Sequence, residues 1–212
     1  MAEEEGRMIA HLRKQGREVV SHLINFSKEA SGAAVVEFAL VVPLMLALFF
    51  LTLEATQALE ANRRVGRLAN QVADLVTQQK EITKDELLAL MMIGRAALEP
   101  YRRSKPTITV TAIQITDEDK PKPKVVWSRS LVGDALVYAE RPDDITELPD
   151  SLLVRGRFLV RAEANLDYRP MILWSADGKE AMGLTAAFDN ISMSARQYYN
   201  PRQTPTIPCG NC

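Results

Sequence analysis

Residues 32–54 read GAAVVEFALVVPLMLALFFLTLE, an apolar run that Glu54 closes and that holds one other ionisable group, Glu37. At about 1.5 Å per residue, residues 33–53 in a helix reach roughly 31 Å, the thickness of the hydrocarbon core of a bilayer. The run therefore predicts one membrane span. A carboxylate inside a span costs on the order of 2 to 4 kcal/mol and is a functional hypothesis by default, while Pro43 predicts a helix kink.

Two targeting signals are alternatives to a permanent span. A cleaved secretory signal fits poorly, because the run starts only at residue 33, is long for such a signal and is followed by no A-x-A triplet. A mitochondrial presequence fits less well, because three glutamates open the chain at residues 3–5. Arginine and lysine residues flank both ends of the run, so the positive-inside rule gives no orientation.

The composition argues for one folded domain in addition to the span. The chain has 212 residues, of which 25% are charged, and a formal net charge of -1, so nothing indicates nucleic-acid binding. His11 and His22 precede the span and Cys209 and Cys212 follow it, so no histidine triad and no Cys/His metal site can form beyond the span. With no phosphate loop and no nucleophile elbow, we expect no catalytic residue, no metal and no cofactor.

Apolar periodicity indicates two helices after the run. Residues 54–79 keep apolar positions at helical spacing without a proline, so the span is predicted to continue as an amphipathic helix. A second helix is predicted from Thr83, which forms a capping box with Glu86, to a point before Pro100. The weaker periodicity of residues 8–26 is typical of an amphipathic helix on a membrane, or of a partly helical leader without a role of its own.

The rest of the chain indicates an antiparallel sheet. Four segments alternate like strands: 107–116, 125–131, 154–168 and 184–198, the last with a bend near Asn190. In 154–168 one face is apolar and the other carries charged residues, which predicts a sheet packed on one side only, under the helices. The fold class is therefore α+β, with an N-terminal transmembrane helix that extends into the domain.

The segment after the last strand carries three prolines and a C-x-x-C at Cys209 and Cys212, and is predicted to be irregular. A C-x-x-C is a redox centre when it opens a helix after a strand, and this one does not. A disulfide or a pair of idle thiols is the favoured interpretation, and a disulfide would be natural if this end of the chain were exported.

The start of the apolar run resembles the processing site of type IV prepilins, which has a glycine, an apolar run and a glutamate five residues on. The resemblance implies that a prepilin peptidase cuts after Gly32 and that Ala33 becomes the new N-terminal residue. Glu37 would then pair with the Ala33 amine of a neighbouring subunit, because that amine is badly placed within its own helix. Such pairing offsets the burial of both charges and favours assembly.

More of the chain is similar to the TadE-like proteins of tight-adherence (Tad, or Flp) pilus systems. Residues 32–54 resemble their N-terminal signature, including Pro43 and the closing Glu54. Weaker echoes follow at three places: Trp127-Ser128, Leu148-Pro149, and the strand end at Tyr168 and Pro170. The resemblance implies a minor, pseudopilin-like component of pilus assembly, with the membrane, other pilus subunits, inner-membrane Tad proteins and a prepilin peptidase as partners.

The layout that follows is a cytoplasmic leader at 1–32, a span of the bacterial inner membrane at 33–53 and a periplasmic domain at 54–212. One alternative is an uncleaved inner-membrane anchor, similar to TadG, whose periplasmic domain binds the assembly machine or the surface. An unrelated single-pass envelope enzyme is a second alternative, disfavoured by the missing acid/base constellation. The N-terminal residue of the mature protein separates the first two functions.

Overall fold

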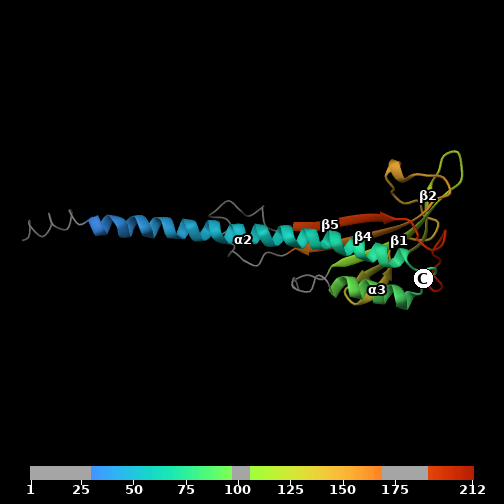
Figure 1. The fold of residues 1–212 in the computed structure, drawn as a ribbon, viewed down its shortest axis with the longest axis horizontal. Helices are drawn as coiled ribbons and strands as arrows, with labels where there is room; N and C mark the ends of the chain where they lie inside the picture. The colour runs from blue at the N-terminus through green and yellow to red at the C-terminus, as the bar shows by residue number, and fades with distance from the viewer. Residues whose placement is uncertain (1–29, 97–105, 169–190) are drawn as a thin grey trace, which may run out of the picture. The chain divides into compact units, whose positions relative to one another are not determined.

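The computed structural model describes residues 30–96, 106–168 and 191–212. Two helices come first, followed by a five-stranded sheet with a short 3-10 helix at Asp150–Leu152 (Figure 1). Their bounds are α2 Ala30–Thr77, α3 Lys84–Ala96, β1 Thr107–Ile115, β2 Pro123–Val132, β3 Ala135–Tyr138, β4 Phe158–Tyr168 and β5 Ile191–Tyr199. The helix predicted within 8–26 and the bend predicted near Asn190 lie outside the described residues.

The chain divides into two compact units, one up to Thr52 and one from Leu53 to Cys212. In the first unit, the apolar part of α2 is exposed on all sides. In the described part of the chain, α2 is the one helix long and apolar enough to cross a membrane. The fold class predicted from the sequence is confirmed: a long apolar helix, a second helix and an antiparallel sheet form an α+β protein.

In the second unit, α2 becomes amphipathic, as its sequence predicted. Its buried stripe recurs at intervals of three and four residues: Ala61, Val65, Leu68, Ala69, Val72, Ala73 and Val76. The stripe packs with Leu87 and Met91 of α3 and with apolar residues of the sheet in one hydrophobic core. Gly94 allows α3 to lie close to α2, because a Cβ at this position would be 2.7 Å from Leu68 Cδ1 and from Val72 Cγ2.

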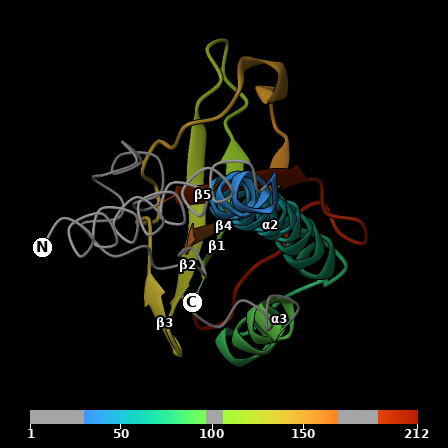
Figure 2. The same cartoon turned by 90° about the vertical axis from the view of Figure 1, so that its left-hand side faces the viewer.

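The sheet has the strand order β3-β2-β1-β4-β5, and every neighbouring pair is antiparallel. Period-2 alternation gives it a core face that packs with the helices and includes Ile108, Val110, Trp127, Leu131, Val160, Ala162, Ala164 and Leu166. Figure 2 shows the strands and α3 in a view turned by 90° about the vertical axis. The predicted strands at 107–116 and 125–131 are confirmed, with β2 longer at both ends.

Two strand predictions were incomplete. The four-residue strand β3, which the turn at Gly133 (φ 63°) and Asp134 pairs with β2, was not predicted. The strand predicted from residue 154 begins only at Phe158. Gly156 has φ 70° and lies in a turn, in which the Arg157 N–H donates to the Val154 carbonyl at 3.1 Å. A backbone in this left-handed conformation cannot belong to a strand.

The face of the sheet opposite the core face, which we call the second face, was predicted to be exposed to solvent. This prediction was wrong at one end of the sheet. Ile113, Ile115 and Leu159 lie on this face and are buried, and Arg161 is only 3% exposed. The cover is the segment between β3 and β4, which pairs with the edge of β2 where the Val125 N–H donates to the Asp144 carbonyl at 2.9 Å. Because the covering residues belong to the irregular segment before β4 and not to the strand, the alternation within β4 could not reveal them.

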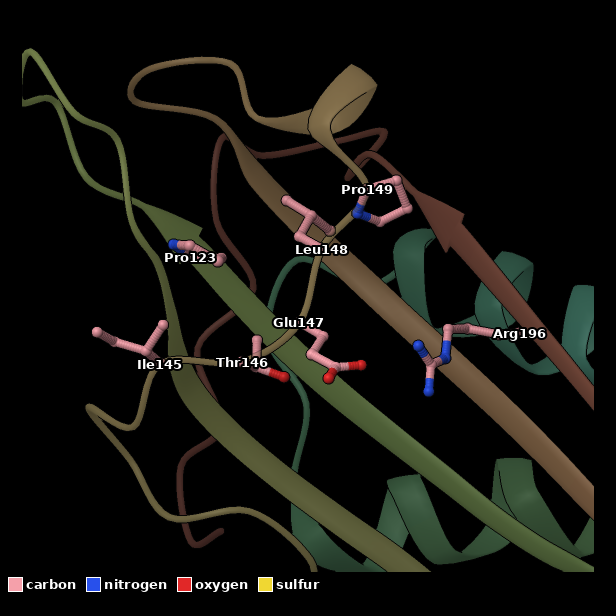
Figure 3. A pocket seen from close by; sticks show the side chains of 7 residues that line it. All are labelled: Pro123, Ile145, Thr146, Glu147, Leu148, Pro149 and Arg196. Carbon is pink, nitrogen blue, oxygen red and sulfur yellow. The ribbon is translucent and has the colours of Figure 1, made fainter.

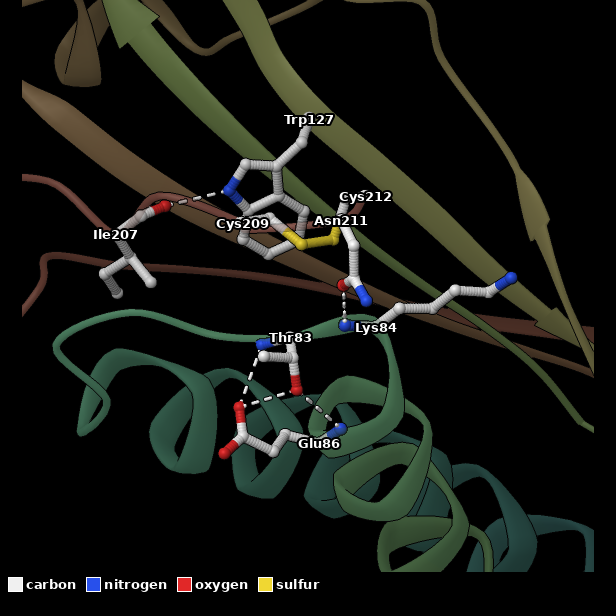
Figure 4. The surroundings of a disulfide bond; sticks show 8 residues. All are labelled: Thr83, Lys84, Glu86, Trp127, Ile207, Cys209, Asn211 and Cys212. Atoms are coloured by element: carbon white, nitrogen blue, oxygen red, sulfur yellow. Dashed lines mark hydrogen bonds between the residues drawn. A yellow bond between two sulfur atoms is a disulfide. The ribbon is translucent and has the colours of Figure 1, made fainter.

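The segment after β5 has no helix or strand, as predicted, but it is held firmly along the connection between α2 and α3. The Ile82 N–H donates to the Pro208 carbonyl at 3.0 Å, and the Gly210 N–H donates to the Ile82 carbonyl at 3.1 Å. From the sheet, Trp127 Nε1 donates to the Ile207 carbonyl at 2.8 Å (Figure 4). We call residues 202–211 the C-terminal strap.

The strap reaches the N-terminus of α3. There the predicted capping box is confirmed: the Thr83 N–H donates to Glu86 Oε2 at 2.8 Å and the Glu86 N–H donates to Thr83 Oγ1 at 3.3 Å. The first of these bonds is the main reason that the pKa of Glu86 lies below its ordinary value. Asn211 Oδ1 accepts from the Lys84 N–H at 2.6 Å, inside the loop that the Cys209–Cys212 disulfide closes (Figure 4).

Candidate functional site: the N-terminal helix

Gly32 belongs to the first turn of α2 and is exposed. A Cβ built at this position would meet no atom within 4 Å in the described structure, and the glycine does not have a left-handed backbone conformation. Neither packing nor backbone geometry in the described part of the chain therefore requires a glycine here. A requirement for glycine would have to come from outside this chain, for example from an enzyme that binds the segment. Ala33 follows it in the same helix.

Glu37 lies one turn further along α2, and its side chain is exposed. The surrounding side chains are exposed and apolar, with Val36 at 60%, Phe38 at 70% and Leu40 at 72%. Glu37 makes no ion pair with any residue that the structure describes. If this surface is covered by lipid or by another protein, a counter-charge for the carboxylate has to be supplied from elsewhere.

Pro43 lies inside α2, and the helix continues through it from Ala30 to Thr77. Because proline has no N–H, the carbonyl of Ala39 loses its usual donor within the helix. The kink expected at Pro43 remains a prediction.

Glu54, the residue that closes the apolar run, has an environment opposite to that of Glu37. It is only 4% exposed, and the hydroxyl of Tyr168, also 4% exposed, donates a hydrogen bond to its Oε1 at 2.6 Å. This contact joins α2 to the end of β4 within the second unit. Sequence reasoning missed the pair, although the family resemblance had marked both residues separately.

The other residues that were noted for their resemblance to the family, Trp127-Ser128 and Leu148-Pro149, also have defined contacts. Trp127 binds the C-terminal strap, as described above, and Ser128 Oγ lies 2.8 Å from Thr111 Oγ1 on the second face of the sheet. Leu148 and Pro149 line a cavity on that second face. The positions noted for their resemblance are thus the places where separate segments of the fold meet.

A comparison with protein families supports the resemblance directly. The family model of TadE-like proteins matches residues 32–74. Residues 32–74 are therefore similar to the TadE-like proteins. The TadE-like match begins at Gly32, includes Glu37, Pro43 and Glu54, and ends within the part of α2 that is buried in the core. No curated protein and no solved structure matches the chain.

No candidate metal site occurs among the described residues. Within ranges 30–96, 106–168 and 191–212, no group of three or more His, Cys, Asp or Glu side chains could hold a metal ion. The shifted pKa of Glu86 has a structural cause, the capping of α3.

Proposed function

We propose that this protein is a membrane-anchored, pseudopilin-like component of Tad pilus assembly and that it is not an enzyme. The observation that carries the proposal is the coincidence of the TadE-like match with a change in the character of α2. The match begins in the half of α2 that is apolar and exposed, and it ends in the half that is packed in the core of an α+β domain.

The exposed half of α2 needs a cover other than water. Large apolar side chains are exposed along it from Val35 to Leu53, which makes a far larger apolar surface than soluble monomers tolerate. A bilayer supplies that cover along the whole exposed half of the helix. We therefore place residues 1–32 in the cytoplasm, residues 33–53 in the bacterial inner membrane and residues 54–212 in the periplasm.

The role of Glu37 follows from its exposure in that apolar surface. Cleavage after Gly32 would create a cationic amine on Ala33, one helical turn before the carboxylate. Pairing that amine with Glu37 of an adjacent pilus subunit would remove two unpaired buried charges at once, whereas a single subunit leaves both unpaired. The partners are then the membrane, other pilus subunits, the inner-membrane Tad proteins and a prepilin peptidase.

The N-terminal residue of the mature protein tests the processing step. In cells with an active prepilin peptidase, the wild-type chain should begin at Ala33, and Gly32→Glu should stay full length in the membrane. Gly66→Glu is the matched control, because Gly66 lies in the same helix and a Cβ there also meets nothing within 4 Å of it. This control should be processed normally.

Finding residues 1–32 intact on the wild-type chain under these conditions would rule out the pseudopilin. It would favour the alternative, an uncleaved inner-membrane protein, similar to TadG, whose periplasmic domain binds the pilus machinery or the surface.

A further inference from the structure

The second face of the sheet holds a cavity of 490 Å³ beneath residues 145–149. Its lining includes Pro123 of β2, Arg196 of β5, and Ile145, Leu148 and Pro149 of the covering segment (Figure 3). We call it the 145–149 groove. The volume is within the range of about 300 to 1,000 Å³ that is usual for binding sites.

The wall of the groove is held in place by the sheet. Arg161, buried on the second face, donates from Nη1 to Thr146 Oγ1 at 2.7 Å and to the Glu147 carbonyl at 3.2 Å. The Thr146 N–H donates to the Pro123 carbonyl at 3.0 Å, and Glu140 forms an ion pair with Arg161. The groove is therefore formed before any partner arrives, which lowers the conformational cost of binding.

The groove offers an apolar surface beside a negative charge. Ile145 is 65% exposed, Leu148 is half-buried, and Pro149 is exposed without an N–H to hydrate. Glu147 lies on the wall, exposed, and its side chain and that of Arg196 point toward each other across the groove (Figure 3).

The cation that lines the groove, the guanidinium of Arg196, already has an ion-pair partner. Arg196 Nε lies 2.7 Å from Glu163 Oε1. Burial alone would lower the pKa of Arg196. The nearby Glu163, with smaller effects of Tyr198 and Glu147, outweighs burial and raises the pKa above its ordinary value. The guanidinium therefore stays charged and paired with Glu163.

Acidic side chains outnumber basic ones in the covering segment of the groove. The segment from residue 140 to residue 150 holds five acids and one base, Arg141. Glu140 is paired with Arg161, and the other four acids are exposed and make no ion pair with a described residue: Asp143, Asp144, Glu147 and Asp150. On the opposite wall, Lys122 and Lys124 flank Pro123, so the excess of acids is confined to the covering segment, where the exposed carboxylate of Glu147 attracts cations.

We propose that the 145–149 groove binds an extended segment of a partner protein in which an apolar side chain stands next to lysine or arginine. The apolar side chain packs against Ile145, Leu148 and Pro149 in the lining of the groove, and the cation pairs with Glu147. This inference does not depend on cleavage after Gly32 or on pairing at Glu37.

The test uses the full chain in a neutral detergent and a fluorescent hexapeptide of alternating leucine and lysine. Its affinity is measured by anisotropy and compared with that of the leucine and glutamate counterpart. Glu147→Lys should weaken binding of the lysine peptide on the order of fivefold or more, because an attraction becomes a repulsion. Glu118→Lys is the matched control, since it changes the net charge equally at an exposed acid outside the lining, and it should bind as wild type does.

A second pair of variants probes the apolar contact. Ile145→Ser should weaken the peptide, whereas Val154→Ser, an exposed apolar residue outside the lining, should not. Circular dichroism of each variant checks that the fold is intact. Equal affinity for both peptides, or equal losses in Glu147→Lys and Glu118→Lys, would overturn the proposal, because either result means binding by detergent or by net charge alone.

Discussion

At the scale of single residues, two glutamates of the TadE-like segment have opposite environments. Glu37 is exposed among apolar side chains and makes no ion pair with a described residue, whereas Glu54 is buried and accepts a hydrogen bond from Tyr168. We propose that Glu37 acts on another molecule, whereas Glu54 makes its contact within its own fold. Substitutions at the two sites should therefore fail in different assays.

Glu37→Val should separate pairing from processing. The substitution makes the helix more apolar, so membrane insertion should be at least as good as in wild type, and cleavage after Gly32 should persist. Co-purification with other pilus subunits and surface piliation should fall, because an unpaired buried charge costs on the order of 3 to 5 kcal/mol. Glu37→Asp keeps the charge with a shorter reach and should be intermediate. Normal piliation by a processed Glu37→Val protein would mean that the glutamate is merely tolerated.

Tyr168→Phe should lower the stability of the second unit. The variant keeps the ring but removes the hydroxyl that donates to Glu54, and the loss of a hydrogen bond to a buried acceptor costs about 1 to 3 kcal/mol. Denaturant unfolding of the full chain in detergent measures the change. Tyr138→Phe, at a tyrosine that is 74% exposed, is the control and should change stability little. Equal unfolding midpoints for Tyr168→Phe and wild type would refute a stabilising role for the bond.

At the scale of the elements, the contact between α2 and α3 depends on Gly94. Gly94→Ala places a methyl group 2.7 Å from Leu68 and Val72, so about 1 to 3 kcal/mol should be lost through overpacking. Gly66→Ala is the counterpart in open space and should be neutral or stabilising by up to about 1 kcal/mol, because alanine favours the helix. Thermal unfolding of the two variants gives the comparison, and a Gly94→Ala protein as stable as wild type would show that the helices can move apart freely.

The elements that could be predicted are those whose signals are local. The capping box at Thr83 and Glu86 needs only two residues three apart, and the apolar stripe of α2 needs only its own periodicity. The strand β3 was not predicted, because four residues carry too little pattern. The burial of Arg161 was not predicted, because its cover comes from the irregular segment before β4, whose path the sequence does not indicate. The residues of the N-terminal helix were found through their resemblance to a family, whereas the bond from Tyr168 to Glu54, 114 positions apart, has no local signal.

At the scale of the whole molecule, the proposed topology places Cys209 and Cys212 in an oxidising compartment. The disulfide between them should therefore block alkylation in freshly isolated membranes until a reductant is added, after which both thiols should react. Mass spectrometry of the alkylated chain counts the labelled thiols. Labelling of both cysteines without a reductant would contradict a periplasmic domain.

The C-terminal strap also determines when the start of α3 can become fully capped during synthesis. The helix α3 receives one of its caps from Asn211, which follows Lys84 by 127 positions. At roughly 5 to 20 residues per second, a ribosome needs about 6 to 25 s to make that stretch. For that interval the start of α3 has its own capping box but not Asn211, and Ile82 has no strap beside it. The domain therefore completes its fold late in synthesis, and a chain interrupted before residue 207 would leave the connection between its helices open to chaperones and proteases.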